Sequence, residues 1–235
     1  MAGPDLYIAN SIAAWAVTDT VTEPTPGVAR VETQHMTRYL LRRRGIDIAP
    51  LLESDPGRRL VVEDSFASPS PALPETVTVK RMPVMVRPAA PTEPKPRPGV
   101  EVHRVSTLDE LRTAERVIVA GFPIEGEVAE GEFLPDKVLG NPHWHVWLAE
   151  HDGVPAAGCF TYDDGASVGV YLLATLAEHR SAGLGRAIMT AAVNQNPSLP
   201  TTLVATEAGA PLYRSMGFVD VSQAVWYFRS VSRVD

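Results

Sequence analysis

The feature that most constrains this chain is a glycine-containing turn, EHRSAGLGRA at residues 178–187, between a strand pattern and a helix pattern. The run VGVYLLATL before it predicts a strand, and GLGRAIMTAAVNQ predicts a helix. Because the first turn of a helix has free N–H groups and a positive dipole end, this order generates an anion site. Gly183 and Gly185 let the backbone approach a ligand, and Arg180 adds a positive charge. The turn therefore predicts a site for a phosphate or pyrophosphate.

Two common phosphate-binding motifs do not describe this turn. No G-K-[ST] is present, which excludes a P-loop, and Ile188 stands where a G-x-G-x-x-G fingerprint has its third glycine. From the turn alone, a structural role in which the glycines only cap the helix stays open.

The segment after residue 99 has a regular order of predicted elements. GVEVHRV predicts a strand, and Thr107 with Glu110 forms a capping box before the helix LDELRTAERVIVA. A long loop rich in Gly, Pro and Glu follows, of the kind that often serves substrates. HWHVWLAEHDGVPAAGCFTYDDGASVGVYLLATL predicts three strands, and after the next helix come the strand TTLVAT, a short helix around APLYRSMGF and the strand AVWYFRS. This order predicts an α+β fold, an antiparallel meander joined to a βαβ unit.

A proline-rich stretch divides the chain. RPAAPTEPKPRPG holds five prolines, so we expect an extended linker at residues 88–98 between domains at 1–87 and 99–235. In the first domain, DLYIANSIAAWAV and TQHMTRYLLRRR predict two helices, the second ending at Gly45. RRLVVED and ETVTVKRMPVMV predict two strands.

Two motifs in the second domain resemble one family. VYLLATLAEHRSAGLGRAIMTAAV resembles the central motif of the GNAT superfamily, the GCN5-related N-acetyltransferases: a strand, an R/Q-x-x-G-x-G/A turn and a helix. Downstream, APLYRSMGF resembles the second signature, in which a tyrosine precedes Gly-Phe by a few residues. The resemblance covers about residues 100–235. It implies a mixed α/β fold, the GNAT acyl-CoA N-acyltransferase fold with a central mixed, mostly antiparallel sheet, and acetyl transfer from acetyl-CoA to an amine.

The resemblance also implies which residues hold acetyl-CoA. In the family, the strand before the turn is splayed from its neighbour and pairs with the pantetheine arm, while the pyrophosphate lies on the turn. Carried over residue by residue, the strand positions are Leu173, Ala174 and Thr175, and the turn positions are Arg180, Ser181, Ala182, Gly183, Leu184, Gly185 and Arg186. Tyr213 is implied as the general acid for the leaving thiolate; the alternative is that its ring only packs under the cofactor. The chain departs from the family at Ala177, where a proline is common, and at TEAGA, which lacks a common asparagine.

No pattern identifies the general base. The candidates lie in the long loop and the strand after it: Glu125, Glu127, Glu130, Glu132, His143, His145 and Glu150. If HWHVWL is a strand, His143, His145 and Trp147 share a face. The two histidines have no third ligand at a supporting spacing, so no metal site is predicted.

Composition limits the remaining classes. A net charge of −7 argues against a general nucleic-acid surface. The single cysteine, Cys159 in the apolar run AAGCF, predicts a buried side chain and a reducing, cytoplasmic environment. No apolar run reaches the length of a membrane span, and no basic residues or cleavage site mark LYIANSIAAWAV as a signal peptide.

The expected function is therefore that of a cytoplasmic, acetyl-CoA-dependent N-acetyltransferase acting on a small-molecule amine. The N-terminal lobe is expected to be noncatalytic, either a degenerate GNAT half or an unrelated α+β lobe. Three alternatives stay open: a peptide or protein amine as acceptor, a catalytically silent CoA-binding regulatory module, and an interaction protein with a merely structural turn. A homodimer through sheet edges also stays open.

Overall fold

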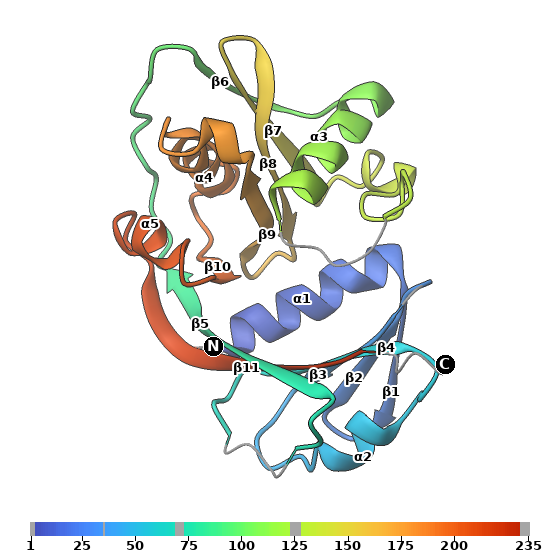
Figure 1. Ribbon diagram of the computed structural model, residues 1–235. Coiled ribbons are helices and arrows are strands. Elements are labelled where there is room, and N and C mark those ends of the chain that lie inside the picture. Colours follow the sequence, from blue (N-terminus) through green and yellow to red (C-terminus); the bar gives the residue numbers. More distant parts are fainter. Residues whose placement is uncertain (1–2, 35, 69–72, 123–127, 231–235) are drawn as a thin grey trace. The chain divides into compact units, whose positions relative to one another are not determined.

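The computed structural model describes residues 3–34, 36–68, 73–122 and 128–230 (Figure 1). The chain forms two compact units. The first unit comprises Met1–Val86 together with Val204–Asp235, and the second unit comprises Arg87–Leu203. The last part of the chain thus groups with the N-terminal residues, whereas the domains expected from the sequence are continuous. The division at residues 88–98 stays a prediction.

The first unit is built on a mixed sheet. Its strands follow the order β1 (Thr20–Thr25), β2 (Val28–Glu32), β3 (Met36–Leu41), β4 (Arg59–Asp64), β11 (Val219–Arg229) and β5 (Val77–Arg87). Only the β3–β4 pair is parallel among these neighbours. Helix α1 (Asp5–Thr18) packs on one face and α2 (Ala49–Glu53) on the other, so both faces bury apolar side chains (Figure 1). A short helix, α5 (Ala210–Arg214), precedes β11.

A buried ion pair lies on the α1 face of this sheet. The guanidinium of Arg38 lies 5.1 Å from the ring centroid of Trp15 and 5.3 Å from that of Trp226, and it pairs with Glu63. The hydroxyl of Tyr7 donates to the same carboxylate at 3.1 Å. Burial lowers the pKa of Arg38 to about 10. Since the charge of Arg38 is paired with Glu63 and covered by two indole rings, this cluster is explained by its role in packing the first unit.

The N-terminal predictions are partly wrong. DLYIANSIAAWAV is helical as expected, but the expected helix TQHMTRYLLRRR contains strand β3 instead. Tyr39 and Leu41 join the core on the α2 side, while Leu40 joins the core on the α1 side. Because β3 is buried on both faces, its apolar residues do not alternate cleanly, and periodicity cannot distinguish such a strand from a helix. The hairpin of β1 and β2 was not predicted.

The second unit matches the expected order of elements. Its sheet runs β10 (Thr201–Val204), β9 (Val168–Thr175), β8 (Val154–Asp163), β7 (Trp144–His151) and β6 (Val100–Arg104). Only the β9–β10 pair is parallel within this set. Helices α3 (Leu108–Gly121) and α4 (Leu184–Asn194) cover opposite faces (Figure 1). The predicted capping box of Thr107 and Glu110 starts α3. The mixed, mostly antiparallel sheet is therefore confirmed. Within the described ranges, no helix is long and apolar enough to cross a membrane.

Candidate active site

Strand β9 is irregular where the acyl donor is expected to bind. Leu172 has a φ of +52°, and the register with β8 passes from Phe160↔Tyr171 to Gly158↔Ala174. A non-glycine residue in this left-handed region is strained and marks a β-bulge. Such a bulge bends the strand and changes the direction of the residues that follow it.

The ladder between β9 and β10 is short. It contains the pairs Thr201↔Val168 and Thr202↔Gly169 and ends there. The last residues of β9 keep their pairing with β8, through Ala174 and Thr175. The β10-side edge of residues 173–175 therefore has no strand partner in this ladder, and its backbone groups are open to an extended ligand.

The glycine turn, residues 180–186, connects β9 to α4. Ser181 has a φ of +67° and Gly183 a φ of +94°. Gly183 is the N-cap of α4, and no side chain caps this helix end. The first N–H groups of α4 have no partner within the helix, so this helix end can hold an anion. The anion site predicted at this turn stays a prediction.

The side chains of the glycine turn have different surroundings. Leu184 is buried in the core, whereas Arg180 and Ser181 are exposed. The Nε of Arg180 donates to the carbonyl of Thr175 at 3.3 Å, which ties the turn to the end of β9. Arg186 lies half-buried in the first turn of α4. Two arginines and a helix N-terminus therefore give this region a positive potential.

Tyr213 belongs to the first unit, whereas the glycine turn belongs to the second. Its side chain, in α5, is buried, and its ring centroid lies 5.7 Å from that of Phe218. A β-carbon placed on Gly209 would lie 3.0 Å from the Tyr213 ring, so the ring lies directly against this glycine. Gly209 is part of TEAGA, the segment that departs from the family pattern. The role of Tyr213 as an acid stays a prediction.

Of the histidine candidates for the base, His145 lies in the first part of β7 and His143 just before this strand. His145 and Trp147 share a face, with ring centroids 6.1 Å apart, and Nε2 of His145 lies 3.2 Å from the carbonyl of Pro142. Burial first, and then the positive charge of Arg104, lowers the pKa of His145 below its ordinary value. A lowered pKa keeps the imidazole neutral near pH 7, as a proton acceptor requires. His143 is exposed.

The acidic candidates are dispersed. Glu125 and Glu127 lie outside the described residues. Glu130 is exposed and pairs with Arg116 at 3.5 Å, and Glu132 accepts from the backbone N–H of Ala129 at 2.9 Å. Glu150 lies in the last part of β7. The base therefore remains a choice among these residues and the histidines.

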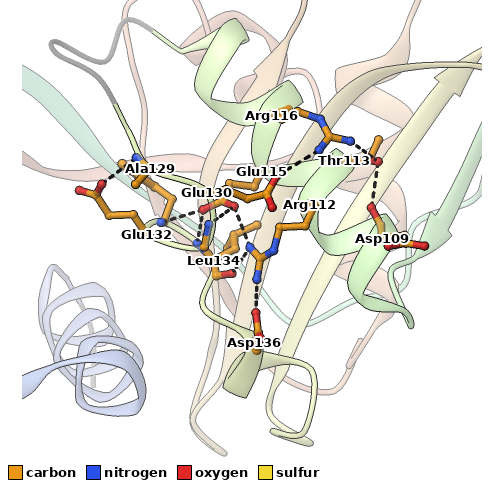
Figure 2. Close-up of polar contacts among 12 residues, drawn as sticks. Asp109, Arg112, Thr113, Glu115, Arg116, Ala129, Glu130, Glu132, Leu134 and Asp136 are labelled. Atoms are coloured by element: carbon orange, nitrogen blue, oxygen red, sulfur yellow. Dashed lines mark hydrogen bonds and ion pairs between the residues drawn. The ribbon is translucent and has the colours of Figure 1, made fainter.

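A buried ion pair missed by the sequence reading anchors the long loop to α3 (Figure 2). Glu115 accepts hydrogen bonds from the backbone N–H groups of Gly131, Phe133 and Leu134 at 2.7, 2.8 and 3.0 Å. Arg112 donates to Glu115 at 2.7 Å and to the carbonyl of Leu134 at 2.9 Å, and it also pairs with Asp136. The sequence contains one signal for this ion pair: Arg112 and Glu115 lie three residues apart on the apolar face of α3.

Replacing Glu115 with alanine is expected to lower the free energy of unfolding by about 3–5 kcal/mol, because it leaves Arg112 charged and buried and three N–H groups without an acceptor. Urea unfolding measures this change. The exposed pair Arg116–Glu130 provides the control, since Glu130→Gln is expected to cost less than about 1 kcal/mol. Equal effects of the two substitutions would contradict an anchoring role for Glu115.

Two other sequence predictions concern cysteine and metals. Cys159 is fully buried, as expected, and burial raises the pKa of its thiol. It therefore behaves as a small apolar side chain. Across the described part of the chain, no three or more His, Cys, Asp and Glu side chains gather in a way that could hold a metal ion.

Comparison with known proteins bears on this arrangement of strand, turn and helix. Residues 142–220 match the family model of the acetyltransferase (GNAT) domain. Among solved structures, a GCN5-related N-acetyltransferase from Kribbella flavida is similar with a TM-score of 0.70 and 19% identity, over 100% of this chain and 98% of that chain. One from Sphaerobacter thermophilus has a TM-score of 0.57 and 15% identity, over 87% of this chain and 77% of that chain.

A tandem GNAT protein from the clavulanic acid biosynthesis pathway is also similar, with a TM-score of 0.53 and 15% identity over 88% of this chain and 79% of that chain. At such identities these likenesses show the fold alone. No curated protein sequence matches the chain.

The fold and the family match together define the class: the chain has the fold of the GCN5-related N-acetyltransferases. Residues 142–220 match the GNAT acetyltransferase domain, and this match together with the fold supports an acyltransferase. GNAT enzymes generally take their acyl group from acetyl-CoA.

Proposed function

We propose that this protein is an acetyl-CoA-dependent N-acetyltransferase that transfers the acetyl group directly to the primary amine of a small molecule. The observation that carries the proposal is the continuous path from the bulged end of β9 to the uncapped N-terminus of α4. Along the chain, the β9–β10 ladder ends at Gly169, the bulge follows at Leu172, and the left-handed Gly183 comes last. A long thioester ligand needs these features in this order.

The residues present fit acetyl-CoA. The open edge of β9 offers backbone groups to the amides of the pantetheine arm, at Leu173, Ala174 and Thr175. The pyrophosphate needs a close backbone approach, and Gly183, the N-cap of α4 with a φ of +94°, supplies it because it has no side chain. Residues 180–186 would then bind the two phosphates through N–H groups and arginines.

Acetyl-CoA supplies an activated acyl group, and the protein residues supply orientation and proton transfer. The attacking amine must be neutral, so a base has to accept a proton from its ammonium form. A backbone N–H on the open edge of β9 would stabilise the negative charge that develops on the thioester oxygen. Tyr213 would donate its proton to the leaving thiolate, since a phenol is ordinarily protonated at neutral pH.

Thiol release from acetyl-CoA, followed in the presence of a panel of small primary amines and of lysine-containing peptides, tests the function. We expect release with at least one small amine and an acetylated amine product of matching amount. Acetylation of peptides alone would instead identify a protein acceptor. Binding of acetyl-CoA without transfer to any acceptor would favour a silent module, and absence of binding in calorimetry would overturn the proposal.

The proposal extends to cellular setting and assembly. It places the enzyme in the cytoplasm, where acetyl-CoA and free amines meet, with the first 87 residues as a noncatalytic lobe. Light scattering of the purified chain distinguishes a monomer from a homodimer through sheet edges.

A further inference from the structure

The proline-rich segment 88–98 runs beside α4 in the second unit (Figure 1). Arg87, at its start, donates hydrogen bonds to the carbonyls of Ala90 and Pro91 at 2.6 and 3.2 Å. Thr92 and Asn194 then bind each other twice: the N–H of Thr92 donates to Oδ1 of Asn194 at 2.8 Å, and Nδ2 of Asn194 donates to the carbonyl of Thr92 at 2.7 Å. The segment is therefore fixed to the last residue of α4.

The other end of the segment lies at the opposite end of the same helix. A β-carbon placed on Gly183 would lie 3.3 Å from both Cγ and Nε of Arg97, so the Arg97 side chain lies against the N-cap of α4. The backbone there is also held, because Val100 donates to the carbonyl of Arg97 at 3.1 Å. The segment thus runs antiparallel to α4, from Asn194 to Gly183.

The two lengths agree. From Thr92 to Arg97 an extended polyproline conformation spans about 16 Å, at ~3.1 Å per residue. From Gly183 to Asn194 the α-helix rises about 17 Å, at ~1.5 Å per residue. Prolines at 94 and 96 favour this extended conformation and limit the entropy lost when the segment is ordered. The spacing between Thr92 and Arg97 therefore matches the length of the helix.

We propose that Arg97 is a phosphate-binding residue of the acyl-CoA site, delivered to the glycine turn by the proline-rich segment. This inference rests on the proposed function. Arg97 is exposed and carries a positive charge at the N-cap of α4, where the dipole and residues 180–186 already favour an anion. Its guanidinium would donate to the pyrophosphate of acetyl-CoA in addition to the helix N–H groups. The segment expected to be only a linker thus forms part of the cosubstrate site.

Calorimetry with acetyl-CoA tests this role. Arg97→Ala is expected to raise the Kd about 10-fold, since it removes one charge-assisted hydrogen bond, and the effect should shrink as salt is added. Lys95→Ala is the matched control: Lys95 is exposed in the same segment and has the same charge, and its removal is expected to change the Kd less than about 2-fold. If both variants raise the Kd by the same factor, Arg97 contributes only to the general positive electrostatic potential, and the proposal is overturned.

A second variant tests delivery by the segment. Asn194→Ala removes both hydrogen bonds to Thr92, so it is expected to weaken binding about 3-fold in the wild-type background and to have no further effect when Arg97 is already alanine. Additive effects would contradict delivery of Arg97 by this anchor. Thermal unfolding of each variant shows whether the fold is intact.

Acetyl-dephospho-CoA, which lacks the 3′-phosphate, distinguishes the two phosphate groups. If Arg97 binds the pyrophosphate, Arg97→Ala weakens the binding of both ligands by the same factor. Loss of the effect with the dephospho ligand would overturn the pyrophosphate assignment. Wild-type protein that does not bind acetyl-CoA would refute the proposed function itself, whereas binding that Arg97→Ala leaves unchanged refutes only this inference.

Discussion

Gly183→Glu is expected to abolish measurable acetyl-CoA binding, raising the Kd more than about 100-fold. Gly183 has a φ of +94°, a left-handed conformation that costs a residue with a side chain about 1–2 kcal/mol. Because the new carboxylate would also stand at the N-cap of α4, it would repel the pyrophosphate and compete for the same N–H groups. Gly183→Ala carries the strain without the charge, so it is expected to lower stability by about 1–2 kcal/mol and to raise the Kd far less than Gly183→Glu does.

Gly165 provides a matched control for the backbone strain. It has a φ of +82° in an exposed turn of the second unit, and a β-carbon there would meet no atom within 4 Å. Gly165→Ala is therefore expected to cost similar stability while leaving the Kd for acetyl-CoA unchanged. Calorimetry and thermal unfolding on all three variants separate strain from binding. A Gly183→Glu protein that binds acetyl-CoA normally would show that the glycine turn is not the pyrophosphate site.

Tyr213→Phe is expected to lower kcat about 100-fold or more, with little change in the KM for acetyl-CoA. The substitution removes the proton that the proposed mechanism gives to the leaving thiolate, and general acid catalysis is worth about 10²–10⁴ in rate. The ring itself stays packed against Phe218, so the fold should be retained. The high-pH limb of the wild-type profile of kcat, which reports loss of the phenolic proton, should disappear in the variant.

Tyr39→Phe serves as the control for loss of a buried hydroxyl in the same unit. The hydroxyl of Tyr39 lies 2.9 Å from Oγ of Ser54, so its removal should lower stability by about 1 kcal/mol and leave kcat unchanged. If Tyr213→Phe retains full kcat and an unchanged pH profile, the alternative holds, and the ring only packs.

The elements after residue 99 could be predicted because local signals agree there. A capping box begins α3, turn residues separate β7, β8 and β9, and the glycine turn precedes α4. The first unit offers weaker signals: β3 is buried on both faces, and β11, which pairs with both β4 and β5, comes from a distant part of the chain. Long-range pairing of this kind outweighs local preference.

The candidate site, too, could be predicted from the sequence only in part. The glycine turn is visible in the sequence because Gly183 and Gly185 lie in a motif. Leu172 has no such signal, since leucine does not favour the left-handed conformation that the bulge imposes. Arg97 and Gly183 lie far apart in the sequence, so their proximity is visible only in the tertiary structure. Sequence patterns therefore identified the turn but not its surroundings.

The position of β11 has a consequence for the order in which the chain folds during synthesis. This strand lies between β4 and β5, yet in the sequence it follows all the strands of the second unit. Residues 87–203 are continuous, so the second unit can fold as soon as that stretch leaves the ribosome. The first unit must wait, with β4 and β5 each lacking β11 as a partner along one edge, until β11 has been synthesised. Chains arrested before β11 would therefore expose two sheet edges, which makes them targets for aggregation and quality control.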